Sequence, residues 1–446
     1  MADPHRVVIL GAGFGGLYAA QALRHAPVDV TIIDKRNFHL FQPLLYQVAT
    51  GSLAPGEIAA PIRGILSRQK NTRTLLGEAV DIDPTAKHVV LKDGSSIPYH
   101  SLIVATGSQP SYFGHDEWNT WAPPLKSIED ATRVRHKILR AFEEAERTSD
   151  PAERRAWLTF VIVGGGATGV ELAGALAEIA HHTLKNDFRS IRPQDATILV
   201  VDGGSRALAS FPEDLSKKAE ESLKRLGVTL RFNVTVTGVD ADGATVKTAS
   251  GSDHIASHTV IWAAGVAVSD FARQLANRTN APTTKSGHIK VNDDLTIPRY
   301  PDIFVVGDLA YLLDAKGKPL PGVAQVAMQG GSYAAKTIIK RVRGNRDIRA
   351  FHYFDKGELA VIGRAAAVAN IFGVQISGFF AWLVWLFIHL LYIVEFQSRL
   401  LVLIEWGFLY LTFNRGARLI TGVDSEDALI DKAPITKRTG SATVGV

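Results

Sequence analysis

Two glycine-rich sequences of the form G-x-G-x-x-G lie about 150 residues apart in this chain of 446 residues. Each directly follows a short run of β-branched and apolar residues, at 7–10 and at 160–163. In such a unit the first glycine permits a tight turn, the second lets backbone amides approach a pyrophosphate, and the third lets helix pack on strand. The pattern therefore predicts two Rossmann-like α/β units with a phosphate at each helix N-terminus. The glycines concerned are Gly11, Gly13 and Gly16 in the first unit and Gly164, Gly166 and Gly169 in the second.

An acidic residue follows the first fingerprint at the end of a predicted strand. We expect a helix at 17–25 and a strand at 28–33, after which Asp34 lies 23 residues beyond Gly11. A carboxylate at about this distance commonly binds ribose hydroxyls. Asp34 is therefore the predicted ribose ligand of the first unit.

The second unit departs from this spacing. A helix at 170–182 and a strand at 196–201 lead to Asp202, which is 38 residues beyond Gly164. A carboxylate there would favour NADH over NADPH, because it bonds the ribose hydroxyls and repels a 2′-phosphate. Arg206 is close in the sequence and leaves this preference open.

The segments after the two fingerprints repeat one order of elements. Further strands are predicted at 74–80, 88–91, 101–104, 259–262 and 303–305. Two of them end in Ala-x-Gly turns that contain Thr106, Gly107 and Gly265, and the last, which leads to Asp308, fits back into the first unit. We therefore expect an α/β protein in which a second dinucleotide-binding domain is inserted in the first. The expected limits are 1–115 with 269–350, then 116–268, and a C-terminal helical region at 351–446.

The chain contains no cysteine. This excludes a redox-active cysteine pair, thiol-dependent sulfide oxidation and cysteine-ligated Fe–S clusters. Electrons must then pass directly from a cofactor to the acceptor. The 14 histidines show no metal-ligand spacing, and His181 and His182 are adjacent and so point apart on a helix. We predict no metal.

The net charge of +5 does not by itself identify a partner. A basic cluster at 336–349 fits either a solvated helix face or contact with lipid headgroups. No nucleic-acid motif accompanies it, so no nucleic-acid partner is expected. The N-terminus enters the first strand without an apolar signal region, and we expect the nucleotide domains to face the cytoplasm.

Two apolar stretches occupy the C-terminal region, at 379–394, interrupted by His389, and at 400–413, with Glu405 inside it. Sixteen helical residues span only about 24 Å, less than the roughly 30 Å hydrocarbon core of a bilayer. Three interpretations remain: a helix lying in the membrane plane, which the short length and the aromatic residues favour, a spanning helix, or a buried core or dimer helix. His389 is expected to be a core or interface histidine.

In several segments the chain resembles the type II NADH:quinone oxidoreductases, which are single-subunit, non-proton-pumping NADH dehydrogenases. The matching segments are 41–47 (FQPLLYQ), 164–171, 306–308 (VGD) and 324–329 (AQVAMQ). The Ala-Gln-x-Ala-x-Gln pattern beside an apolar tail is more specific than the glycine motifs, which occur throughout the two-dinucleotide flavoproteins. The resemblance covers almost the whole chain.

This resemblance implies a role for each candidate residue. The first domain would hold FAD non-covalently through its fingerprint and Asp34, with Asp308 at the ribityl-phosphate region and Thr106 and Gly107 against the same cofactor. The second would hold NADH through its fingerprint and Asp202, with Gly265 lining the channel. The resemblance makes Glu171 a proton-delivering acid and places Gln325 and Gln329 at the quinone. It also implies a respiratory-chain enzyme bound to the cytoplasmic face of the inner membrane, as a homodimer.

Simpler interpretations exist for the same residues. Glu171 could offset the helix dipole in a first helical turn, Gln325 and Gln329 could be polar surface, and Asp308 could be a helix N-cap. Two other functions also fit the motifs: a flavoprotein reductase with a soluble protein acceptor, and a membrane-bound flavin-nucleotide sensor with little turnover.

Overall fold

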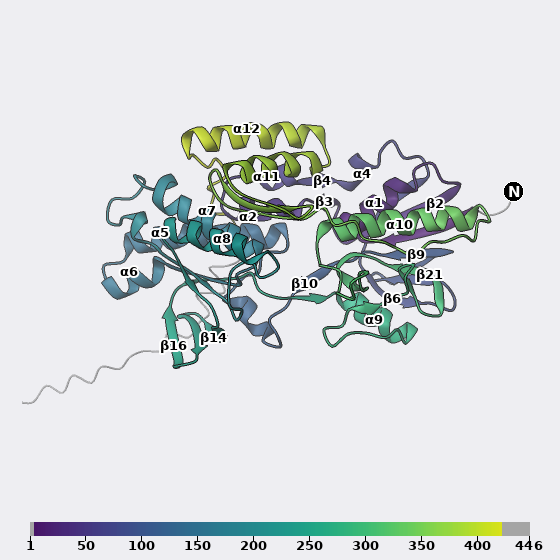
Figure 1. Cartoon of the computed structure of the whole chain (residues 1–446), viewed down its shortest axis with the longest axis horizontal. Helices are drawn as coiled ribbons and strands as arrows, with labels where there is room; N and C mark the ends of the chain where they lie inside the picture. Colours follow the sequence, from purple (N-terminus) through teal and green to yellow (C-terminus); the bar gives the residue numbers. More distant parts are fainter. Residues whose placement is uncertain (1–3, 422–446) are drawn as a thin grey trace, which may run out of the picture.

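A six-stranded sheet forms the centre of the first lobe in the computed structural model, which describes residues 4–421 (Figure 1). Strand β1 pairs in parallel with β2 and β9, and β21 continues the parallel order beyond β9. Because β1 and β9 are covered on both faces, their sequences are nearly continuous apolar runs. The strand order is β20 (Thr296–Ile297), β21 (Tyr300–Val305), β9 (Ser101–Val104), β1 (His5–Leu10), β2 (Val28–Asp34) and β5 (Thr72–Leu76).

The second lobe repeats this architecture with a four-stranded parallel sheet. Strand β11 lies in its middle, between β12 and β17. The strand order is β13 (Val228–Arg231), β12 (Thr197–Val201), β11 (Thr159–Val163) and β17 (Thr259–Trp262). The chain then returns to the first lobe, where β21 pairs with β9. The exact domain limits given above stay a prediction.

Short sheets fill the remaining strand positions. The ribbon of β10 (Ser108–Pro110) and β18 (Val266–Val268) lies between the two lobes (Figure 1). The three-stranded sheets are β6 (Ala79–Asp83), β7 (His88–Leu91) and β8 (Ser96–Pro98); β14 (Thr235–Asp240), β15 (Gly243–Thr248) and β16 (Gly251–Ala256); and β23 (Glu358–Gly363), β24 (Ala366–Ile371) and β25 (Val374–Gly378). The two-stranded pairs are β3 (Phe38–Leu40) with β4 (Ala59–Pro61) and β19 (Ile289–Lys290) with β22 (Ala310–Tyr311).

Helices cover the sheets and in places touch backbone to backbone. A Cβ at Gly331 would lie 2.0 Å from the carbonyl oxygen of Gly15, so the helices that contain these glycines can approach closely only without side chains there. The α-helices of the two lobes are α1 (Phe14–Ala22), α2 (Leu45–Ala49), α3 (Pro55–Ile58), α4 (Ile62–Ile65), α5 (Ile128–Arg147), α6 (Pro151–Trp157), α7 (Ala167–Glu178), α8 (Glu213–Arg225), α9 (Asp270–Thr279) and α10 (Ala324–Val342).

The C-terminal region forms a layer across one side of the molecule (Figure 1). It consists of the β23–β25 sheet, α11 (Phe379–Tyr392) and α12 (Phe396–Thr412), and β23 packs on α7. Trp385 and Trp406 belong to the same apolar core as α2 and α7. Over residues 4–421, no helix combines the length and apolar character needed to cross a bilayer.

Three sequence expectations need correction. The strand expected at 74–80 is divided at Gly77, whose N–H donates to the Asp34 carbonyl (2.9 Å) before the chain leaves the main sheet to form β6. The helix expected at 17–25 is α1, which begins inside the fingerprint at Phe14 and ends at Ala22. The helix expected at 170–182 also begins earlier, as α7, and continues in a π-helical turn at Ile179–Thr183.

Replacing Gly174 by Ala should destabilise the contact between α7 and the C-terminal layer. The added methyl group would lie 1.6 Å from the carbonyl oxygen of Ile362 in β23, so the two elements must separate. Overpacking of this kind costs about 1–3 kcal/mol of unfolding free energy, and thermal unfolding should show a lower Tm.

Gly407→Ala in α12 is the matched control, because nothing lies within 4 Å of a Cβ at that position. Alanine in a helix is favoured over glycine by about 1 kcal/mol, so this variant should be at least as stable as the parent. Equal Tm values for the two variants would contradict the close packing.

Candidate functional site

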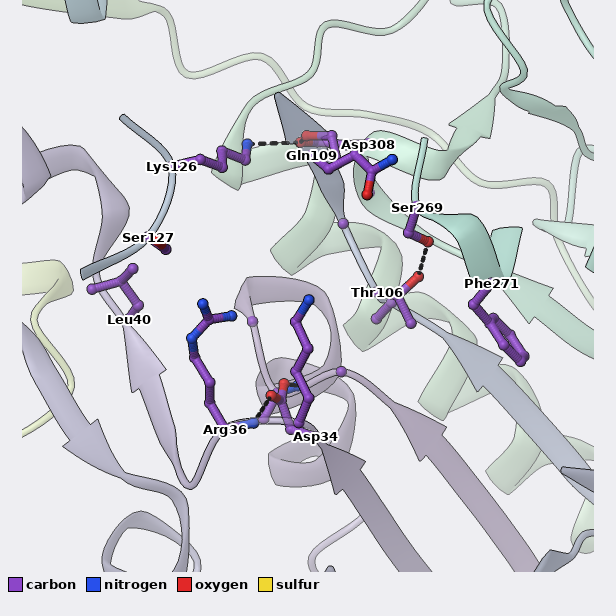
Figure 2. Close-up of a pocket in the computed structure, with 18 of the residues that line it drawn as sticks. Asp34, Arg36, Leu40, Thr106, Gln109, Lys126, Ser127, Ser269, Phe271 and Asp308 are labelled. Atoms are coloured by element: carbon purple, nitrogen blue, oxygen red, sulfur yellow. Dashed lines mark hydrogen bonds and ion pairs between the residues drawn. The ribbon is translucent and has the colours of Figure 1, made fainter. Parts of the chain in front are cut away.

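A cavity of about 1060 Å³ opens where the carboxyl ends of the strands in the first sheet meet (Figure 2). Residues from the first fingerprint, the Thr106–Gly107 turn and the segment around Asp308 line it together. Ligands of open α/β sheets bind at this edge of the sheet. The tertiary structure thus brings six of the candidate residues, Gly11, Gly13, Asp34, Thr106, Gly107 and Asp308, to one cavity. Gly16 packs beneath it, and Gln325 and Gln329 do not line it.

The first fingerprint has the backbone geometry that its glycines predict. Gly11 has φ +92°, and a Cβ there would lie 2.4 Å from the carbonyl oxygen of Ala105. Gly16 packs as closely on Gly11, whereas a Cβ at Gly13 would meet nothing within 4 Å. Gly13 is also the N-cap of α1 and supplies no side-chain cap. The first N–H groups of α1 are therefore available to an anion such as a pyrophosphate.

Asp34 stands beside this helix N-terminus. One carboxylate oxygen accepts a hydrogen bond from the backbone N–H of Ala12 (2.6 Å) and the other from that of Arg36 (2.7 Å). These two bonds fix the carboxylate at the cavity wall and leave lone pairs on both oxygens for ribose hydroxyls. Figure 2 shows Asp34 and Arg36 together at one end of the cavity.

Asp308 lies at the other end of the same cavity, in the 3₁₀ turn Gly307–Leu309. It accepts a hydrogen bond from the Ser108 hydroxyl (2.5 Å) and lies 3.7 Å from the Lys126 ammonium group (Figure 2). The hydroxyl groups of Thr106 and Ser269, which line the same cavity, are hydrogen-bonded to each other at 2.8 Å. The sequence assigned no role to Ser108, although it directly follows the Ala-x-Gly turn, nor to Lys126 and Ser269, which no motif marks.

These features together fit FAD. The cavity offers an uncapped helix N-terminus for a pyrophosphate, a carboxylate for a ribose and hydroxyl-bearing side chains along its length.

The second fingerprint repeats the first in detail. Gly164 has φ +116° and packs on the backbone of Ala263, while Gly169 packs on Gly164. Gly166 is the N-cap of α7 and again supplies no side-chain cap, with nothing within 4 Å of its Cβ position. A second anion site of the same kind results.

Asp202 occupies the position that Asp34 has in the first domain. Its carboxylate accepts hydrogen bonds from the backbone N–H groups of Gly165 (2.6 Å) and Gly204 (2.5 Å). Gly165 is the second residue of its fingerprint, as Ala12 is of the first. The long connection before β12 therefore does not displace the acid. Arg206 donates to the carbonyl oxygen of Ala209 (2.9 Å).

Glu171 belongs to α7, but not to its first turn, which contains no acidic residue. The dipole explanation offered above is therefore wrong. The backbone N–H of Val361 in β23 donates to the Glu171 carboxylate over 3.4 Å. Burial raises the pKa of this carboxyl from 4.5 to about 8. At neutral pH the carboxyl is thus mostly protonated.

Gln325 and Gln329 lie one turn apart on α10 and bind the chain segment that leads into the C-terminal layer. The Gln325 amide donates to the Gly357 carbonyl (2.9 Å) and accepts from the Lys356 N–H (3.3 Å). The Gln329 amide forms the same pair of bonds with Phe354, both 2.9 Å. They are therefore not simply polar surface, because each holds the segment with both ends of its amide.

His389 is half-buried in the C-terminal layer. Its Nδ1 lies 2.7 Å from the carbonyl oxygen of Trp385, and burial lowers its pKa to about 4. Among residues 4–421, no group of three His, Asp or Glu side chains has the arrangement of a metal site.

Comparisons with known proteins agree with this geometry. Residues 5–331 match the model of the pyridine nucleotide-disulphide oxidoreductase family, and residues 356–412 match that of the NDH2 C-terminal domain. The chain is 45% identical to type II NADH:quinone oxidoreductase Ndh of Mycobacterium tuberculosis, over 94% of this chain and 90% of that protein. It is 29% identical to the mitochondrial external NADH-ubiquinone oxidoreductase 2 of Saccharomyces cerevisiae, over 91% of this chain and 80% of that protein.

A solved structure supports the fold. The structure of NDH2 from Plasmodium falciparum in complex with NADH superposes with a TM-score of 0.84 at 21% identity, covering 93% of this chain and 99% of that one.

Glu171 should make the stability of the protein depend on pH. In the folded chain this carboxyl keeps its proton up to pH about 8, whereas in the unfolded chain it ionises near its usual pKa of 4.5. The folded state then binds more protons between these values, so its stability falls as the pH rises through them, by at most about 1.4 kcal/mol per pH unit. Glu171→Gln removes this contribution, and its unfolding free energy, followed by denaturant titration, should fall less over that range. Parallel pH profiles for parent and variant would contradict the raised pKa.

Proposed function

The chain belongs to the pyridine nucleotide-disulphide oxidoreductases and, within them, to the type II NADH:quinone oxidoreductases, and we propose that α7 is the element that joins its two half-reactions. The protein transfers two electrons from NADH through FAD to a quinone. In the overall reaction NADH, a proton and a quinone give NAD⁺ and a quinol. We propose that this proceeds without proton pumping.

Helix α7 contributes to both nucleotide sites. Its N-terminus at Gly166 is the anion site of the second fingerprint, and Thr168 lines the cavity of the first domain. A dinucleotide with its pyrophosphate at Gly166 therefore lies next to that cavity. This supports hydride transfer between the nicotinamide and a flavin held by Asp34, Asp308 and the first fingerprint.

FAD, when bound, supplies the redox chemistry: it accepts hydride from NADH and passes electrons on in the quinone step. The chain supplies binding, orientation and protons. The neutral carboxyl of Glu171 can donate a proton to a quinone oxygen and regain one from solvent, because a pKa of about 8 lies close to working pH. This partly buried acid with a raised pKa, on the helix of the NADH site, is the observation that carries the proposal.

Gln325 and Gln329 have the hydrogen-bonding groups that a quinone site needs. Each side-chain amide uses one N–H for the 354–357 segment and keeps a second one. That second N–H can bond a quinone carbonyl. Because the first bond fixes each amide, the donor would be held in place before the quinone arrives.

The C-terminal layer presents an apolar face of the kind that a bilayer interface binds. Large apolar side chains are exposed on both α11 and α12, which run side by side at the edge of the molecule (Figure 1). They include Phe379, Phe380, Leu383, Phe387, Leu391, Phe396, Leu400, Leu403, Ile404, Phe408 and Leu411. We propose that both helices lie in the plane of the membrane, at its cytoplasmic face, so that quinone enters from lipid. A homodimer would align two such layers.

Glu171→Gln should separate the two half-reactions. In anaerobic stopped-flow experiments NADH should bleach the flavin absorbance of parent and variant at similar rates. Reoxidation by a soluble quinone analogue should be slower in the variant by about 10²-fold or more, since a positioned general acid contributes 10²–10⁴. In the parent the rate of reoxidation by quinone should fall as the pH rises through about 8, because Glu171 loses its proton there. The variant should lack this pH dependence. Unchanged reoxidation would refute the role of Glu171.

The same traces distinguish the alternative functions. If NADH bleaches the parent flavin and quinone does not restore it, the protein is a sensor or uses another acceptor. If a ferredoxin restores it and quinone does not, the acceptor is a soluble protein.

Charged substitutions on the exposed face of the layer should weaken membrane binding. Phe408→Glu with Leu411→Glu removes two exposed apolar side chains, each worth about 1.5–3 kcal/mol when buried. Co-flotation with phosphatidylglycerol-containing vesicles should fall at least tenfold. Leu76→Glu is the matched control, because Leu76 is 65% exposed but lies on β5, in the first lobe. Equal flotation of all three proteins would exclude this face as the anchor.

A further inference from the structure

We infer that Phe113 is a positioning residue for NADH, with its ring forming the outer wall of the site for the nicotinamide half. This inference rests on the proposed function of the second fingerprint. It concerns a residue that belongs to neither glycine motif and follows β10 in the segment between the two lobes.

The first observation is where the ring lies. A Cβ at Gly265 would be 2.5 Å from Cζ of Phe113, so the tip of the ring stands directly over the α-carbon of Gly265. Gly265 has φ +72° and follows β17. The turn that it closes packs against Gly164, because a Cβ at Gly164 would lie 2.7 Å from the carbonyl carbon of Ala263. Phe113 therefore contacts the turn at 263–265, which itself packs on the phosphate-binding turn.

The order of strands shows which half of the dinucleotide passes this point. Strand β11, which leads to the fingerprint, lies between β12 and β17. Asp202 follows β12, so the adenosine ribose lies on that side. A dinucleotide with its pyrophosphate at Gly166 must then extend its other half toward the end of β17 and Gly265. Thr168, in the first turn of α7, lines the flavin cavity, where the nicotinamide has to arrive.

The second observation is that the free protein gains little packing from this ring. Phe113 is 70% exposed and has φ +55°, a left-handed conformation that is unfavourable for a bulky residue. Its ring centroid is 6.4 Å from that of Trp262, at an angle of 60°.

The backbone nonetheless holds the residue in place. The Ser111 carbonyl accepts a hydrogen bond from the Trp262 indole (2.9 Å), and the Ser111 N–H donates to the Gly265 carbonyl (3.3 Å). The Phe113 N–H donates to the Ser111 hydroxyl (3.3 Å). The segment is thus tied to the end of β17 with an aromatic face left open, which suits stacking on the flat nicotinamide ring.

The test compares ligands that contain or lack the nicotinamide half. With the FAD-loaded protein, titration calorimetry would measure binding of NAD⁺ and of ADP, which has the adenosine and pyrophosphate only. Phe113→Gly removes the ring while accepting the left-handed backbone without strain. It should weaken NAD⁺ binding about tenfold and leave ADP binding within twofold, and the NADH concentration that half-saturates flavin reduction should rise by a similar factor.

Two further variants exclude a general effect. Phe113→Tyr keeps the ring and should bind NAD⁺ within threefold of the parent. Phe372→Gly is the matched control, because Phe372 is also a left-handed phenylalanine (φ +50°) and 65% exposed, but lies between β24 and β25. It should bind both ligands like the parent.

The inference is overturned if Phe113→Gly binds NAD⁺ within twofold of the parent, or if it loses ADP affinity to the same extent, which would indicate damage to the whole site. Failure of NADH to reduce the flavin of the parent protein would instead refute the proposed function, and the binding titrations would still decide the position of Phe113.

Discussion

The close packing of α7 against β23 is the contact on which the site depends. Gly174 has no side chain, so the backbone of Ile362 reaches the surface of the helix. The same approach brings the Val361 N–H to Glu171 and covers its carboxyl. Burial then raises the pKa of that carboxyl to about 8. A helix that begins as a phosphate-binding element therefore carries a proton-bearing group in its second turn.

Buried polar contacts join the C-terminal layer to both lobes. The Trp406 indole donates to the Gln47 amide oxygen (2.7 Å), and Arg415, which is 3% exposed, forms an ion pair with Glu178 of α7 (3.0 Å). Arg415 also donates to the Thr50 hydroxyl (3.2 Å). Such groups are costly to bury without partners, so their pairing favours one position of the layer over others. These contacts therefore fix the position of the apolar face relative to α7.

Much of the fold was predictable because it depends on local backbone geometry. The two fingerprints, the ends of β2 and β12 and the return of β21 to the first sheet follow from glycine spacing and apolar runs. Asp202 was placed correctly at the end of its strand although its spacing is unusual, because the extra residues before β12 leave that strand end beside the fingerprint. Ser108, Lys126 and Phe113 could not be found in this way, because their contacts with Asp308 and Gly265 join residues far apart in the chain. The division of the strand at Gly77 was missed for the same reason, because pairing with another sheet decides it.

The sequence by itself determined that the chain has two nucleotide-binding turns and two strands whose carboxyl ends lead to an aspartate. It also determined that the chain has no thiol chemistry and has an apolar C-terminal region. These properties reside in single segments, in which glycine conformation and side-chain chemistry act over a few residues. The tertiary structure alone decided that Glu171 is partly buried with a raised pKa, that the two glutamines bind the 354–357 segment, and that an aromatic ring lies over Gly265. Each of these depends on segments far apart in the chain, because burial and close contact are properties of the packed molecule and not of a motif.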